Sequence, residues 1–226
     1  MRVASPRGSS LSPEPPIAVA IRGRPPVSSR RLELEDIADL RAYERGRLEF
    51  RRQIIAVKRR RRVALGALVT VVFESRETVL FQVQEMARAE RMASDAQIQR
   101  ELDIYNTLVP SPGELSATLF VELTDEQALR TWLPRLVGVE RCVEVRLGTE
   151  PDIRVVRCLP EEAHDKALTR PEATSAVHYI RFAFDARDVE AFAVGPVTLR
   201  VVHPEYCAET LLSDQTRSEL LADLRD

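Results

Sequence analysis

The residues from Leu115 to Leu123 limit most strongly what this chain can fold into. Their apolar side chains fall at every second position: Leu115, Ala117, Leu119, Val121 and Leu123. Because successive side chains of a β-strand point to opposite faces, this alternation predicts a strand with one buried face. That face needs other strands or helices to cover it, so the chain must form a layered domain.

Apolar residues elsewhere recur with the period of a helix or of a strand, in an irregular order. The patterns predict helices at 35–61, 76–93, 95–109, from Thr124 to about Pro134, at 186–193 and 213–224. They predict strands within 63–74 and at 115–123, 143–147, 153–158, 176–184 and 197–203. Gly46 is a possible break in the first helix, Ser94 and Thr124 are expected N-caps, and 159–174 is expected to be a loop. Without a regular strand–helix–strand repeat, we expect an α+β fold with a mixed or mostly antiparallel sheet packed with helices.

The first 31 residues have a different composition from the rest of the chain. They hold six Pro, six Ser and two Gly with scattered Arg. Such a segment buries too little apolar surface to offset the entropy lost on ordering. We therefore expect a disordered arm over 1–31 and a single α+β domain over 32–226.

Hydropathy and cysteine content indicate a cytoplasmic protein that makes no membrane contact. The longest nearly apolar run, Val63 to Phe73, has 11 residues, whereas a transmembrane helix needs about 20. The short run from Ile17 to Ile21 is bracketed by prolines and does not resemble a signal peptide. Three cysteines without a CxxC spacing argue against a disulfide framework or zinc ribbon and favour free thiols in a reducing compartment.

Positive charge is concentrated at the end of the first expected helix. Residues 1–62 carry 16 basic and 7 acidic side chains, whereas the rest of the chain carries 17 and 28. The candidates for binding an anion or nucleic acid are Arg51, Arg52, Lys58, Arg59, Arg60, Arg61 and Arg62. Alternatively, these cations favour the helix C-terminus, and the basic helix packs on an acidic body. With 5% aromatic residues and no recognised reader motif, the chain is not expected to bind nucleic acid.

Two carboxylates interrupt otherwise apolar helical arcs. Glu85 lies nine residues before Ser94 and Glu101 seven residues after it. If the two helices fold back at Ser94, the carboxylates stand at nearly the same level, about 3 Å apart along the axis. Close carboxylates in a dry site need a buried arginine, a shared proton or a metal ion.

Two histidines add possible ligands. His178 and His203 each lie on the more apolar face of an expected strand. Together with Glu85 and Glu101 they are a candidate set for a divalent metal such as iron or zinc. The alternative is structural: glutamates pair with arginines and histidines bond to backbone carbonyls. No complete catalytic motif occurs, so whether the chain is an enzyme stays open.

From about Leu34 the sequence resembles a bacterial family of proteins of unknown function. The matching stretches are YERGRLEFRRQIIAVKRRRRV, ESRETVLFQVQEMARAER, IQRELDIYNTLVPSPGELSATLFVEL and HPEY. The resemblance supplies no catalytic residues. It implies gene neighbours encoding rubrerythrin-like proteins and iron–sulfur oxidoreductase subunits, and hence partners of that kind. Residues 1–31 extend beyond the family's start, either as a true tail or through a misplaced start.

Three functions follow as hypotheses. The first is an accessory role in oxidative-stress or iron/redox pathways, with a carboxylate/histidine metal site. The second is a nucleic-acid or anionic-ligand binding module that uses the basic patch at 51–62. The third is a structural partner of an oxidoreductase. The sequence does not determine an oligomeric state.

Overall fold

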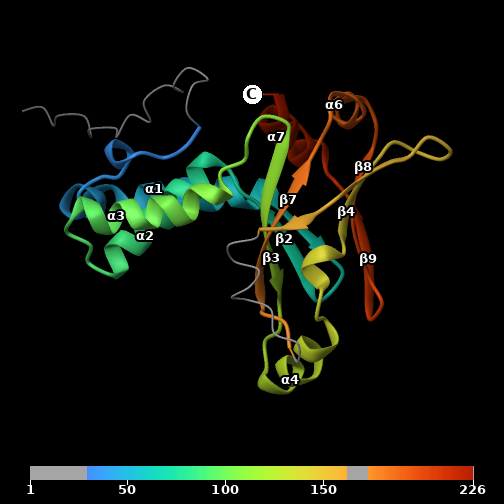
Figure 1. Cartoon of the computed structure of the whole chain (residues 1–226), viewed down its shortest axis with the longest axis horizontal. Helices are drawn as coiled ribbons and strands as arrows, with labels where there is room; N and C mark the ends of the chain where they lie inside the picture. Colours follow the sequence, from blue (N-terminus) through green and yellow to red (C-terminus); the bar gives the residue numbers. More distant parts are fainter. Residues whose placement is uncertain (1–29, 162–172, 226) are drawn as a thin grey trace, which may run out of the picture.

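The computed structural model describes residues 30–161 and 173–225 and has an α+β architecture, as expected (Figure 1). The helices are α1 (Leu40–Arg61), α2 (Arg76–Ala89), α3 (Asp95–Tyr105), α4 (Glu126–Arg135), α6 (Ala186–Val194) and α7 (Asp214–Arg225). The strands are β1 (Arg62–Leu65), β2 (Val69–Phe73), β3 (Glu114–Val121), β4 (Val143–Leu147), β5 (Arg154–Arg157), β6 (Leu159–Pro160), β7 (Val177–Ala183), β8 (Val197–His203) and β9 (Tyr206–Leu211).

The strands form two antiparallel sheets. The first has five strands in the order β1-β2-β3-β7-β6, and the second has four in the order β5-β4-β8-β9. In the first sheet Leu119 of β3 lies opposite Val71 of β2 and His178 of β7. Short connections join β1 to β2, β4 to β5 and β8 to β9, and all the strand pairs of the described residues are antiparallel, as expected.

The main core lies between the two sheets. The expected alternation in β3 is confirmed, since Leu115, Ala117, Leu119 and Val121 are all buried. Leu119 packs in one cluster with Ile180 of β7 and with Leu199 of β8. The inner face of the first sheet is thus apolar, while its outer face carries polar residues such as Thr118.

Helices α1, α2 and α3 lie together beside this pair of sheets, as Figure 1 shows in blue and green. They share a second, smaller apolar cluster that includes Val83 of α2 and Leu102 of α3. Helix α7 packs against α1, α6 and β3. The molecule therefore has two apolar centres, and the outer face of the first sheet lies where they meet.

The structure corrects several element boundaries. Helix α1 runs through Gly46 without a break, capped by Asp39, because packing on α2 outweighs the cost of about 1 kcal/mol for an interior glycine. Asp125, not Thr124, accepts the capping hydrogen bond of α4. The capping box of Ser94 with Gln97 is confirmed. Strand β6 lies in the expected loop, and strand β9 was missed.

The described chain begins two residues before the expected boundary. Arg30 donates to the carbonyl groups of Pro110 and Asp223, at 3.0 and 3.1 Å. Leu32 is buried, and its backbone exchanges two hydrogen bonds with the Asn106 side chain. The disorder expected of 1–29 concerns residues outside the described part. Within that part, no helix is long and apolar enough to cross a membrane.

Candidate functional site

Glu85 lies on α2, and helix α1 satisfies its carboxylate. Arg47 Nε and Nη2 donate to the two carboxylate oxygens, each at 2.7 Å. The Tyr43 hydroxyl donates to Oε1, also at 2.7 Å. The Glu85 side chain is 25% exposed, so the carboxylate is partly buried. Of the three ways to satisfy this carboxylate, the structure contains the arginine.

The pKa of Glu85 reflects this contact. The hydrogen bonds from the Arg47 guanidinium lower it from 4.5 to about 2, against a smaller opposing effect of burial. The Tyr43 hydroxyl acts in the same direction, while burial and the nearby carboxylate raise its own pKa. Glu85 is therefore charged at neutral pH and holds α1 against α2.

The four residues proposed as metal ligands do not form one cluster. Glu101 lies on α3 and is partly exposed, whereas Glu85 is bound by α1. Over the ranges 30–161 and 173–225, no group of three or more His, Cys, Asp or Glu side chains is placed to hold a metal ion. Helix spacing around Ser94 fixes the level of a side chain but not the neighbour that it faces, and Glu85 faces Tyr43 and Arg47 of α1.

Both histidines are buried and hydrogen-bonded. His203 Nε2 lies 3.0 Å from the Val137 carbonyl oxygen, and its Nδ1 accepts from the Glu205 backbone N–H. His178 Nε2 lies 2.7 Å from the Thr174 hydroxyl oxygen. These contacts match the structural interpretation that the sequence left open.

Most of the basic run is engaged within the chain. Arg60 pairs with Glu219 of α7, and Arg61 pairs with Asp223 of the same helix. Arg62 pairs with Glu122, which follows β3. Arg52 is paired with Glu49, and Arg51 and Arg59 are exposed. The contacts agree with a basic helix that packs on an acidic body.

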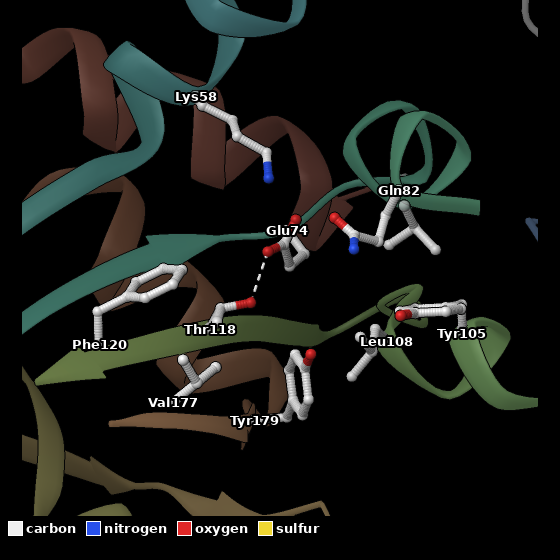
Figure 2. Close-up of a pocket in the computed structure, with 10 residues that line it drawn as sticks. Lys58, Glu74, Gln82, Tyr105, Leu108, Thr118, Phe120, Val177 and Tyr179 are labelled. Carbon is white, nitrogen blue, oxygen red and sulfur yellow. Dashed lines mark hydrogen bonds between the residues drawn. The ribbon is translucent and has the colours of Figure 1, made fainter. Parts of the chain in front are cut away.

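Lys58, the remaining member of the run, faces a pocket between the helical layer and the outer face of the first sheet (Figure 2). The cavity has a volume of about 150 Å³. Its lining comes from α1, α2, α3, β3, β7 and the segments that follow β2 and α3: Lys58, Glu74, Val79, Gln82, Tyr105, Leu108, Thr118, Phe120, Val177 and Tyr179. Pockets of this kind commonly form where two packed units meet.

Glu74 is the buried charged group of the pocket. Its carboxylate accepts hydrogen bonds from the Thr118 hydroxyl at 2.6 Å and from the Thr78 hydroxyl at 2.5 Å. The side chain is 7% exposed, and no cation of the described ranges forms an ion pair with it. Because Glu74 directly precedes the N-cap Ser75, the positive end of the α2 dipole partly stabilises its charge.

Partly exposed polar side chains surround Glu74. Figure 2 shows the Lys58 amine and the Gln82 side chain reaching toward the carboxylate. Two tyrosines, Tyr105 and Tyr179, lie on another side of the pocket. Burial raises the pKa of Tyr179, with further contributions from Tyr105 and Glu74. The pocket thus combines one buried anion, one cation and several neutral hydrogen-bonding groups.

Sequence reasoning did not find this site. In the sequence, Glu74 ends an apolar strand and looks like the start of a loop, and Thr118 falls on the polar side of the strand expected at 115–123. In the structure Ser116 and Thr118, on the face opposite the core, are also buried. Only the placement of the helical layer over that face reveals their burial.

Comparison with known proteins places the chain in an uncharacterised group. A family model described as "Protein of unknown function (DUF3501)" matches residues 31–224. A crystal structure of a "novel protein of unknown function" from Burkholderia pseudomallei K96243 is 32% identical, with a TM-score of 0.77. The match covers 85% of this chain and 98% of that one. No curated protein matches. The expected likeness to a family of unknown function is confirmed, and none of these relatives supplies an activity.

Proposed function

Since this chain belongs to the DUF3501 family of proteins of unknown function, we propose a function from its pocket: it binds a small polar molecule between the helical layer and the first sheet. The observation that carries the proposal is the Glu74 carboxylate, which is buried in the wall of a cavity. Lys58 and Gln82 converge on the same cavity.

The Glu74 carboxylate is buried without an ion pair among the described residues. Burying a carboxylate is costly unless it is paired and hydrogen-bonded. Glu74 has hydrogen bonds from two hydroxyl groups, and no described cation forms an ion pair with it. Charged groups kept in a cavity under such conditions are candidates for function, because a purely structural position would be more stable with a neutral side chain.

The size of the cavity limits the ligand. An apolar engineered cavity of similar volume, about 150 Å³, holds a benzene-sized molecule. A ligand of about six non-hydrogen atoms is therefore appropriate for this pocket. Four of the lining residues are buried and six are partly exposed. The ligand would therefore enter past the six partly exposed residues and contact Glu74, which is one of the four buried residues.

The proposal narrows the earlier hypothesis of an anionic-ligand module. In that hypothesis the whole patch at 51–62 contacts the ligand, whereas here Lys58 alone lies in the pocket. Nucleic acid is a poor candidate, since three of the arginines already bind carboxylates. A redox or iron-linked partner stays a prediction from the family resemblance, and elemental analysis of the purified protein would test for a bound metal.

Ligand-observed nuclear magnetic resonance provides the test of small-molecule binding. A set of small acids, amines, amino acids and neutral amides would be screened against the full chain. The Val177→Phe variant fills part of the cavity, and Val202→Phe is its matched control on the exposed side of β8. We expect compounds that bind the wild type and Val202→Phe but not Val177→Phe.

Two results would contradict the proposal. One is that no compound of any class binds the wild type. The other is that binding persists unchanged in Val177→Phe, which would place the bound compounds elsewhere on the protein. Because Val177 is partly exposed, the larger ring is expected to leave the fold intact, and the amide spectrum of the variant checks this.

A further inference from the structure

We infer that the ligand of this pocket is a small zwitterion, with an amine at one end and a carboxylate at the other. The inference rests on the proposed function and specifies its ligand class. It follows from the opposite charges of two side chains, Lys58 and Glu74, that line the same small cavity and face one another in Figure 2.

The anionic side of the pocket suits an amine. Each oxygen of a carboxylate can accept about two hydrogen bonds, and each oxygen of Glu74 accepts one from a threonine hydroxyl. One acceptor position per oxygen is left for a ligand N–H group. Tyr179 and Tyr105 also line the pocket.

The cationic side of the pocket suits a carboxylate. Within the described ranges, Lys58 makes no ion pair with an acidic side chain and projects from the last turns of α1 into the pocket. The Gln82 amide, which also lines the pocket, carries a further N–H donor. A ligand carboxylate would therefore receive one charged and one neutral hydrogen bond.

A ligand with a single charge can pair with only one of the two charged side chains, Lys58 or Glu74. An amine alone would sit between Glu74 and Lys58, and the Lys58 ammonium would repel it. An acid alone would be repelled by Glu74 in the same way. A zwitterion places each charge against its opposite, and its short carbon chain can rest on Val79, Leu108 and Val177. Electrostatic matching of this kind gives specificity.

The test compares four probes of nearly equal size: β-alanine, propionate, propylamine and propionamide. Their affinities for the full chain would be measured by nuclear magnetic resonance titration. We expect β-alanine to bind about tenfold tighter than propionate or propylamine, which each lack one charge-assisted hydrogen bond. Glycine and 4-aminobutyrate, with shorter and longer spacing between the charges, would then show which separation fits.

Two variants test the contributions of the Lys58 and Glu74 charges separately. In Lys58→Met we expect β-alanine to bind no tighter than propylamine, and in Glu74→Gln no tighter than propionate. If Glu74→Gln fails to fold, the comparison of the four probes on the wild type and the Lys58→Met variant still test the inference. Lys58 is partly exposed, so its substitution is expected to leave the fold intact.

If propionate or propylamine bound the wild type as tightly as β-alanine or more tightly, the inference of a zwitterionic ligand would be wrong. The proposal that the pocket binds a small molecule would still stand. A uniform loss for all probes in either variant would also overturn it. Absence of binding by every probe and every compound of the screen would contradict the proposed function itself.

Discussion

Glu85 is a candidate metal ligand in the sequence, whereas in the structure it pairs with an arginine. It was selected because it interrupts an apolar helical arc, and the structure places it against Arg47 and Tyr43 of α1. Sequence reasoning identified both the anomaly and the arginine alternative. It could not identify the partner, because Arg47 lies 38 positions away and that contact depends on how two helices dock.

Replacing Glu85 with Gln should lower the free energy of unfolding by about 1–3 kcal/mol at pH 7, since charge-assisted hydrogen bonds to Arg47 are lost. Urea denaturation measures the change. Glu101→Gln is the matched control on α3, expected to change stability by no more than about 0.5 kcal/mol. Equal effects of the two substitutions would contradict this assignment.

The same contact predicts a dependence on pH. Because folding lowers the pKa of Glu85 from 4.5 to about 2, its contribution is complete above pH 4.5 and is lost as the pH falls toward 2. The stability difference between wild type and Glu85→Gln should therefore shrink over that range. A difference that stays constant between pH 5 and about pH 2 would show that the charge of Glu85 is not involved.

At the scale of elements, the strands were predicted best. The period of β3 predicted its apolar inner face, because successive side chains of a strand point to opposite faces, but not the burial of its outer face. Strand β9 was missed, since its residues alternate between partly exposed and exposed, with none buried, and include polar residues such as Glu209. Its place at the edge of the second sheet is set by the turn after His203, which pairs it with β8.

Leu119→Ala should lower the free energy of unfolding by about 2–5 kcal/mol, because the side chain is fully buried between the sheets and would leave a cavity. Urea denaturation again measures the effect. Leu48→Ala is the control: Leu48 is 65% exposed on α1, so the same change should cost about 0.5 kcal/mol or less. A near-neutral Leu119→Ala would contradict the described core.

Tyr206 connects the two sheets through one hydroxyl group. It donates to the Leu65 carbonyl at 2.5 Å and accepts from the Leu68 backbone N–H at 3.1 Å. Tyr206→Phe leaves both groups without this partner and should cost about 1–3 kcal/mol. Tyr105→Phe, which removes a pocket hydroxyl instead, should leave thermal stability unchanged. A Tyr206→Phe protein as stable as the wild type would mean that water replaces the hydroxyl.

At the scale of the whole molecule, the helical layer depends on a segment that the sequence assigned largely to the arm. Arg30 and Leu32 bind the segment between α3 and β3, and Arg30 also reaches α7. Composition could not reveal this, because Pro- and Ser-rich residues precede the segment directly. A chain that begins at Arg30 should therefore be more stable than one that begins at Glu33.

The expected difference between these two truncated chains is about 2–4 kcal/mol, from the burial of Leu32 and its two hydrogen bonds with Asn106. Thermal and urea unfolding of both chains would measure it. Identical stability would show that residues 30–32 do not hold the helical layer in solution.

The pocket is also a property of the whole molecule, because its residues come from both the helical layer and the first sheet. The most direct measurement of the central claim is the set of intermolecular nuclear Overhauser effects between bound β-alanine and the protein methyl groups. We predict contacts from the probe's methylene protons to Val79, Leu108 and Val177, which line the pocket. Contacts confined to methyl groups elsewhere, such as those of Val155 or Leu211 on the exposed surface, would contradict the assignment of this pocket as the binding site.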